Sequence, residues 1–128
     1  MNATNRHMLS GYRVLDLTRA VAGPTCTRMF AEMGAEVIKI EAAPNGDLTR
    51  QISKLRNDRS LYLIQQNLNK KSFCVDLHTP EGIELVKELV PHCDVVVENY
   101  RPGVLADMGL GYDVLKTCLL YTSDAADE

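Results

Sequence analysis

Three short segments of this 128-residue chain combine glycine or proline with polar and charged side chains in a pattern that favours anion binding. They are TRAVAGPT at 18–25, DLHTPEG at 76–82 and ENYRPG at 98–103. Each runs into residues with helical spacing, and the first N–H groups of a helix attract phosphate or carboxylate because they have no partner inside the helix. In the first segment, Gly23 also lacks the side chain that would keep a ligand away from the backbone. These segments are therefore candidates for binding a phosphorylated ligand.

The first segment also has a purely structural explanation. The sequence contains no G-x-G-x-x-G motif, and on pattern alone an A-G-P turn is more often a tight connection between a strand and a helix. Only Glu41 is placed where a dinucleotide-binding fold needs an acid for the ribose. Arginines in loops are commonly solvated or weakly paired. Arg19, Arg50 and Arg101 are thus open either to phosphate contacts or to solvent.

No catalytic or metal centre can be assembled from the residue spacing. The three histidines are scattered, the four cysteines lack a C-x-x-C spacing, and no Ser-His-Asp or Cys-His set is indicated. His78 follows a strand and could contact a ligand, although capping or solvent contact is the commoner role for such a residue. We therefore expect no metal site.

Four strand patterns alternate with helix patterns along the chain, and they position these segments. The strands are expected at 13–17, 36–41, 72–77 and 94–99. The last contains three consecutive valines, which predict burial on both faces. Strands separated by single helices favour an α/β fold with a Rossmann-like open, mostly parallel sheet and flanking helices. Ligands bind such sheets beyond the carboxyl ends of the strands, where the three segments begin.

Two helices and one long polar stretch complete the pattern. Spacing at i, i+3, i+4 and i+7 after the first strand predicts one apolar helix face, formed by Cys26, Met29, Phe30 and Met33. Thr79 is a suitable N-cap for the second helix, and Pro80 suits its first position. The polar stretch 42–59 is long enough to predict a functional loop or a short irregular helix.

Composition bounds the class of protein and its partners. The chain is 45% hydrophobic and 24% charged, as is ordinary for one soluble domain. Its net charge of −3 comes from three acidic residues in the last eleven, without which acidic and basic residues balance. Bulk charge thus gives no sign of a nucleic-acid partner. There is no apolar run of signal-peptide or membrane-spanning kind, so we expect a cytoplasmic protein that does not enter a membrane.

Four blocks of the sequence resemble the amino-terminal region of the family III CoA-transferases. This family includes formyl-CoA:oxalate and carnitine CoA-transferases and the 2-methylacyl-CoA racemases. The blocks are VLDLTRAVAGPTCTRMFAEMGAEVIKIE, GDLTR, NLNKKSFCVDLHTPEG and DVVVENYRPGVLADMGLGYDVL, and they cover about residues 9 to 117. The resemblance implies that residues 1–117 form the amino-terminal part of a CoA-binding Rossmann-like domain, which is incomplete here. GDLTR and SLYLIQQNLNKKS are most similar to the formyl-CoA transferase side of the family.

The resemblance implies an enzyme that moves coenzyme A between an acyl-CoA and a carboxylic acid without a metal. In the family, an aspartate attacks the thioester to form a mixed anhydride. No aspartate of this chain occupies that position, so we expect the nucleophile beyond its end and no transferase activity from the 128 residues alone. Full-length members form interlocked homodimers. The alternatives are a racemase of the same family, or a non-catalytic nucleotide-binding module.

The CoA contacts of the family can be carried onto matching positions in this chain. The turn at Val21 and Ala22 resembles the backbone segment that lies along the CoA and approaches the thioester. The residues resembling the segment near the adenosine end are Val75, Asp76, Leu77 and His78. The residues resembling the loop that holds the nucleotide and phosphates are Asn99, Tyr100 and Arg101. The chain has Ala42 where some members have arginine and Asp107 where many do, which removes two cations from the expected CoA contacts.

The end of the chain departs from the family pattern. The residues CLLYTSDAADE at 118–128 resemble the translation of a transposon-end adapter that is used in preparing sequencing libraries. We therefore expect residues 118–128 to be a non-native tail and the chain to be a fragment. A genuine acidic tail is the alternative, although CLLY is apolar for a solvated segment.

Overall fold

The computed structural model describes residues 7–52 and 59–119. The strands are β1 (Arg13–Asp16), β2 (Glu36–Ala42), β3 (Lys71–Val75) and β4 (Val95–Val97). The α-helices are α1 (Ala22–Glu32), α2 (Leu61–Gln66), α3 (Pro80–Leu89), α4 (Val104–Asp107) and α5 (Tyr112–Cys118). Two short 3-10 helices are η1 (Leu48–Gln51) and η3 (Val90–His92). Each predicted strand is present, with ends that differ by one or two residues.

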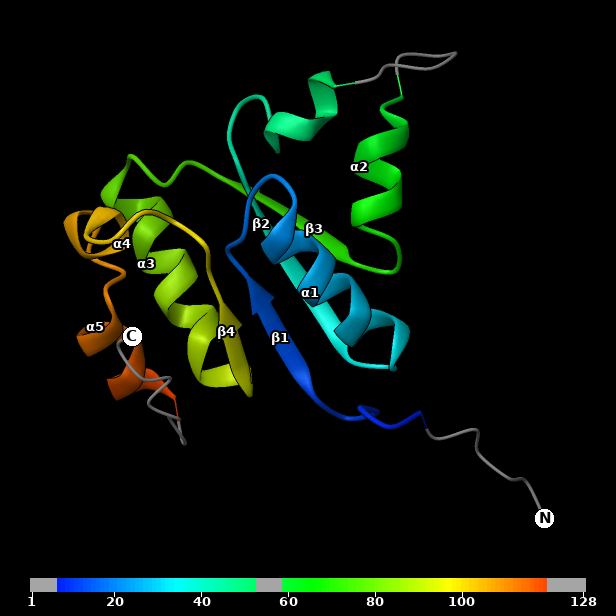
Figure 1. The fold of residues 1–128 in the computed structure, drawn as a ribbon. Coiled ribbons are helices and arrows are strands. Elements are labelled where there is room, and N and C mark those ends of the chain that lie inside the picture. The colour runs from blue at the N-terminus through cyan, green and yellow to red at the C-terminus, as the bar shows by residue number, and fades with distance from the viewer. Residues whose placement is uncertain (1–6, 53–58, 120–128) are drawn as a thin grey trace.

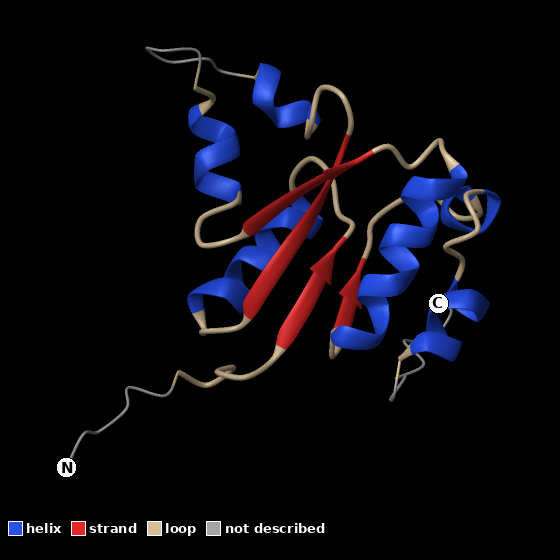
Figure 2. Cartoon of the chain, turned by 180° about the vertical axis from the view of Figure 1, so that it is seen from behind, coloured by secondary structure: helices blue, strands red, loops and turns tan. Residues whose placement is uncertain are grey.

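The four strands form one parallel sheet in the order β3-β2-β1-β4. In register, Val14 lies between Val37 of β2 and Val95 of β4. Helix α1 lies on one face of the sheet (Figure 1), and α3 lies on the opposite face (Figure 2). The predicted α/β fold, a Rossmann-like open parallel sheet with flanking helices, is confirmed.

Helix α1 forms, but the predicted apolar face of this helix is wrong. Its buried residues are Gly23, Pro24, Thr27 and Ala31. By contrast, Met29 is 55% exposed, Cys26 is exposed, and Phe30 and Met33 are only partly buried. Small side chains let the helix backbone approach the sheet closely, as the longer side chains of the predicted face could not. Spacing therefore located the helix but chose the wrong side of it.

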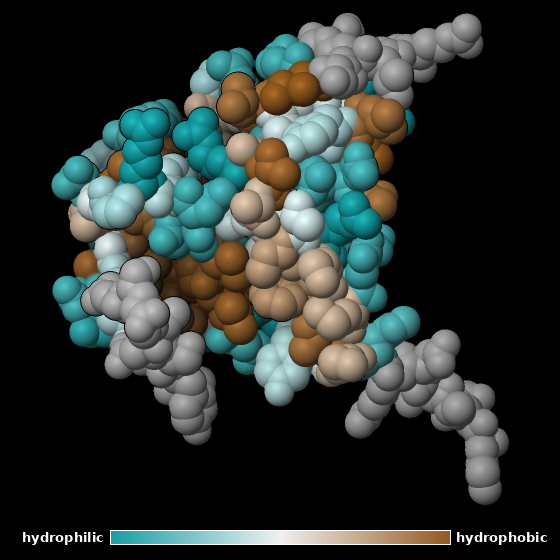
Figure 3. Space-filling view, viewed as in Figure 1, coloured by the Kyte–Doolittle hydropathy of each residue, from teal (hydrophilic) through white to brown (hydrophobic). Residues whose placement is uncertain are grey.

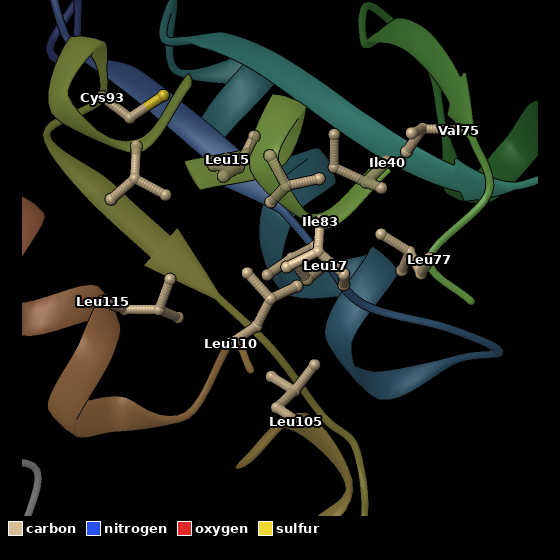
Figure 4. Close-up of a cluster of buried hydrophobic side chains, with 12 residues drawn as sticks. Leu15, Leu17, Ile40, Val75, Leu77, Ile83, Cys93, Leu105, Leu110 and Leu115 are labelled. Carbon is tan, nitrogen blue, oxygen red and sulfur yellow. The ribbon is translucent and has the colours of Figure 1, made fainter. Parts of the chain in front are cut away.

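The larger hydrophobic core lies on the α3 face of the sheet (Figure 4). Leu15 and Ile40 from the sheet pack there with Val86 of α3, with Leu110 from the connection between α4 and α5, and with Leu115 of α5. Helix α3 begins as predicted, because the Thr79 hydroxyl accepts a hydrogen bond from the Gly82 N–H at 3.1 Å and Pro80 is the first helical residue. This core holds the strands at fixed positions, and so fixes the loops that follow them.

The prediction that the valines of β4 are buried on both faces is wrong. Val95 is 39% exposed, and Val96 and Val97 are only partly buried. The reason is topological: β4 is the last strand of the sheet in this structure and pairs with β1 alone. A run of β-branched residues indicates a strand, but it does not reveal whether that strand is central or at an edge.

The polar stretch 42–59 contains the short helix η1, as predicted. Asp47 caps it, because its carboxylate accepts a hydrogen bond from the Thr49 N–H at 2.8 Å. Residues 53–58 of this stretch lie outside the described residues. So does most of the predicted non-native tail, since the described part ends at residue 119.

Candidate functional site

Two of the three predicted segments lie side by side at the carboxyl edge of the sheet. Strands β1 and β4 are neighbours, so the turn after β1 and the loop after β4 meet there. Asn99 connects them: its side-chain oxygen accepts a hydrogen bond from the Arg19 N–H, and its side-chain nitrogen donates to the Arg19 carbonyl, both at 2.8 Å. The third segment follows β3, which β2 separates from β1.

The residues carried over from the family divide into exposed and buried groups. Val21, Ala22, His78, Asn99 and Arg101 are exposed. Among the others, Val75 and Leu77 belong to the larger core, so their side chains are unavailable to a ligand. Asp76 is partly buried and accepts a hydrogen bond from the His78 N–H at 2.9 Å. Any ligand contact at Val75 or Leu77 must therefore use the backbone.

The turn at 18–21 has a constrained backbone. The Thr18 N–H donates to the Asp16 carboxylate at 2.9 Å, and the Thr18 carbonyl accepts from the Lys39 Nζ at 2.8 Å. Ala20 has a φ of +65°, a left-handed conformation that a side chain disfavours. Beyond it, Val21 is the N-cap of α1, and no side chain caps this helix. The start of α1 is thus exposed, has no side-chain cap and follows a constrained turn. Such a helix start is suited to binding an anionic group.

Gly23 is required for packing within the protein. A Cβ at this position would lie 2.4 Å from the Thr18 Cβ and 3.0 Å from the Asn99 Cγ. The absent side chain thus makes room for Thr18 and Asn99. The structural explanation of the A-G-P turn, a tight strand-to-helix connection, is the one that the structure favours.

Tyr100 and Arg19 add a cation–π contact across the same two loops. The Arg19 guanidinium lies 5.9 Å from the centre of the Tyr100 ring. Burial raises the pKa of the Tyr100 hydroxyl above its usual value, and the nearby positive charge of Arg19 only partly opposes this effect. Tyr100 is therefore a neutral ring at physiological pH, with Arg19 as the charged group beside it.

Two buried ion pairs lie close to the turn, and neither was predicted from the sequence. Lys70 Nζ is 2.9 Å from Asp16 Oδ2, and Lys39 Nζ is 2.9 Å from Asp47 Oδ2. All four side chains are at most 2% exposed. One signal was present: Lys39 stands at an alternating position of a strand whose other residues on that face are buried. A charged residue at an inward position of a strand indicates a buried partner.

A third carboxylate near this edge, Glu41, is held in its ionised form. Arg50 donates two hydrogen bonds to it, at 2.6 and 2.7 Å, and the Ser72 hydroxyl donates a third at 2.7 Å. Burial alone would raise the pKa of Glu41, but these bonds and one from the Asp47 N–H outweigh burial and lower the pKa to about 2. Arg50 is thus committed to Glu41, which argues against a role for it in phosphate binding.

The fold should lose stability in acid through Glu41. Because its pKa falls from 4.5 to about 2 on folding, its contribution is complete above pH 4.5 and is lost as the pH drops toward 2. We expect the free energy of unfolding of the wild-type chain to fall more steeply over this range than that of Glu41→Gln. Urea denaturation at several pH values measures both. Parallel pH profiles would contradict the assignment.

One hollow in the surface does not coincide with the predicted residues as a set. It has a volume of about 710 Å³ and runs along the open side of β4. Val95, Leu105 and Leu115 line it together with Tyr100 and Arg101, but Val21, Ala22 and residues 75–78 do not. Figure 3 shows hydrophobic side chains recessed in this part of the surface. Only the loop after β4 is shared between the hollow and the predicted site.

The described residues contain neither a metal-binding cluster nor a membrane-spanning helix. Within residues 7–52 and 59–119, no group of three or more histidine, cysteine or acidic side chains is arranged to hold a metal ion. Over the same ranges, every helix is too short or too polar to cross a bilayer.

The parallel sheet, the helices on both faces and the loops at its carboxyl edge define an α/β protein of the Rossmann-like class. The sequence profile of CoA-transferase family III matches residues 9–118. The chain belongs to this family, as the four sequence blocks predicted.

Individual relatives agree with this assignment. The chain is 50% identical over 106 residues to succinyl-CoA:glutarate CoA-transferase of Mus musculus, covering 82% of the chain and 24% of the mouse protein. It is 46% identical over 110 residues to formyl-CoA:oxalate CoA-transferase of Rhodopseudomonas palustris (strain BisA53), covering 85% of the chain and 26% of that protein. The chain thus spans about a quarter of the length of these relatives.

Solved structures show the same similarity in three dimensions. A CAIB/BAIF family protein from Brucella suis superposes with a TM-score of 0.82 at 39% identity, over 89% of this chain and 31% of that one. The D175A mutant of Rv3272 from Mycobacterium tuberculosis gives a TM-score of 0.81 at 41% identity, over 88% of this chain and 30% of that one.

Proposed function

We propose that the whole protein is a transferase that moves coenzyme A from an acyl-CoA to a carboxylic acid. The observation that carries this proposal is the match to CoA-transferase family III over residues 9–118. The named relatives support transfer rather than racemisation, since they are CoA-transferases acting on succinyl-CoA or formyl-CoA. Residues 1–117 would belong to the CoA-binding domain of this enzyme.

The carboxyl edge of the sheet is the proposed position of the CoA. Helix α1 begins at this edge without a side-chain cap, so the backbone at Val21 and Ala22 presents the positive end of the helix dipole. Arg19 and Arg101 are exposed cations in the two loops that Asn99 connects. Phosphate groups are recognised by such a combination of helix N–H groups and guanidinium groups. His78 lies further along the edge, where it would meet another part of an extended ligand.

The proposed reaction is nucleophilic. A carboxylate of an aspartate attacks the thioester carbon, the C–S bond breaks, and the CoA thiolate leaves a mixed anhydride behind. Asp16 and Asp47 cannot supply this carboxylate, because both are buried and paired with lysines. By its resemblance to the family, the chain has no aspartate at the position of the nucleophile. We therefore place the nucleophile outside the described residues, which would bind the CoA without attacking the thioester.

Replacing Arg101 tests the proposed position of the CoA. A charge-assisted hydrogen bond to phosphate contributes about 1.5–3 kcal/mol, so Arg101→Ala should weaken CoA affinity by about ten-fold or more. The control is Lys87→Ala, which removes a positive charge from the last turn of α3. Elution of each variant of the full chain from immobilised CoA with free CoA measures the difference. Equal elution of the two variants would contradict the assignment.

A comparison with NAD separates a CoA-binding protein from a general nucleotide-binding module. We expect the wild-type chain to be retained on immobilised CoA and to pass through immobilised NAD. Stronger retention on NAD would favour the module and would overturn the proposed function.

A further inference from the structure

A buried line of polar contacts connects helix η1 to the turn after β1. Asp47, the N-cap of η1, pairs with Lys39 at 2.9 Å, and the Lys39 Nζ also donates to the Thr18 carbonyl at 2.8 Å. Both charged side chains are only 2% exposed. Lys39 is therefore an internal bridge between two loops that leave different strands.

The buried Lys39–Asp47 pair is better suited to positioning the backbone of the turn than to stabilising the fold. Taking a lysine and an aspartate out of water costs free energy that their attraction only partly offsets, and apolar residues of similar size are often as stable. A charged pair does, however, fix direction. The Lys39 ammonium needs oxygen atoms around it. It contacts the Thr18 carbonyl and the Asp47 carboxylate. The orientation of the peptide after Thr18 is thereby set from inside the protein.

The same turn is held from the outside by Asn99, through both polar groups of the Arg19 backbone. Ala20 lies between these hydrogen-bonded residues and the start of α1, and its φ of +65° is unfavourable for an alanine. A conformation of this kind persists only when its surroundings impose it. The hydrogen bonds that Lys39 and Asn99 form with this turn impose the conformation of Ala20.

The far end of the bridge is equally well fixed. The Asp47 carboxylate accepts hydrogen bonds from the Thr49 N–H at 2.8 Å and from the Thr49 hydroxyl at 2.6 Å, and the Asp47 N–H donates to Glu41 at 2.9 Å. The GDLTR motif therefore acts inside the protein, where its aspartate holds Lys39 in place. No surface contact with a ligand is needed to explain this motif.

We propose that Lys39 is a positioning residue for CoA binding: anchored by Asp47, it holds the Thr18 carbonyl and so sets the backbone of the turn at Val21 and Ala22. This inference rests on the proposed function, because it assumes that CoA lies against that turn. It assigns Lys39 no contact with the ligand.

The test uses a double variant, Lys39→Met/Asp47→Asn, in the full chain. Asparagine keeps the oxygen that caps η1, and no buried charge is left without a partner. The matched control is Lys87→Met/Glu84→Gln, which removes an exposed ion pair within α3. Circular dichroism establishes that both double variants are folded. We expect CoA affinity, measured by calorimetry, to fall about ten-fold or more in the first variant and to stay within about two-fold in the control.

A second readout does not depend on CoA. The amide resonances of Arg19 and Ala20 should shift in Lys39→Met/Asp47→Asn and stay in place in the control. If these resonances do not move in the folded variant, the positioning role is wrong, whatever happens to CoA. If they move but the wild-type chain binds no CoA, the proposed function fails while the link from Lys39 to the turn stands. A folded variant with altered resonances and wild-type CoA affinity would overturn the inference.

Discussion

Replacing Lys70 with methionine should lower the free energy of unfolding by about 3–5 kcal/mol, because it leaves a buried carboxylate without its partner. The Lys70 Nζ lies 2.9 Å from Asp16 Oδ2 and within hydrogen-bond distance of the Pro24 carbonyl, the Thr27 hydroxyl and the Asn67 side chain. Burial lowers the pKa of Lys70, and the negative charge of Asp16 opposes this effect. The ammonium thus connects β1, α1 and the end of α2. Urea denaturation at pH 7 measures the loss.

The control for this experiment is Lys87→Met. Lys87 forms an exposed pair with Glu84 within α3, and such pairs contribute about 0–1 kcal/mol. The double variant Asp16→Asn/Lys70→Met should recover part of the loss, since neither charge then remains buried alone. Equal unfolding free energies for Lys70→Met and Lys87→Met would show that the Lys70–Asp16 pair contributes no more to stability than an exposed pair.

Replacing Gly23 with alanine should destabilise the chain by about 1–3 kcal/mol, the usual effect of overpacking. The added Cβ would lie 2.4 Å from the Thr18 Cβ and 2.5 Å from its Cγ2, so the turn has to move. The sign is informative, because in an unobstructed helix the same exchange stabilises by about 1 kcal/mol. We also expect CoA affinity to fall, since the displaced turn is the one that carries Val21 and Ala22.

The control for Gly23 is Gly11→Ala, the same exchange just before β1, at the opposite end of that strand from the proposed site. No heavy atom of the described residues, apart from the chain neighbours, lies within 4 Å of a Cβ at Gly11, although its φ of +97° makes alanine strained there by about 1–2 kcal/mol. Its effect should therefore be on stability alone. A Gly23→Ala chain that is more stable than the wild type, with unchanged CoA affinity, would contradict the packing argument.

Much of the fold could be predicted from local patterns. Apolar runs located the four strands, and Thr79 and Pro80 marked the start of α3. The packing side of α1 could not be predicted, because helical spacing does not reveal that the sheet needs small residues there. The exposure of Val95 could not be predicted either, because a run of valines does not show whether β4 has a neighbouring strand on both sides.

The candidate site was predictable to the level of loops. Glycine and proline marked the turns, and parallel topology placed them at one edge. The contact between Asn99 and Arg19 joins residues that are 80 positions apart, so no local pattern could reveal it. The bridge from Asp47 through Lys39 to Thr18 is equally non-local. Lys39 nevertheless gave a signal, since it is a charged residue within a buried strand.

The most direct test of the account is an NMR titration of the isotope-labelled chain with CoA. If the carboxyl edge of the sheet binds CoA, the largest shifts should occur at the amides of Val21, Ala22, His78 and Arg101. The same titration with NAD should give smaller shifts. Shifts that are largest at the opposite ends of the strands, at Arg13 and Glu36, or no shifts at millimolar CoA, would contradict the account.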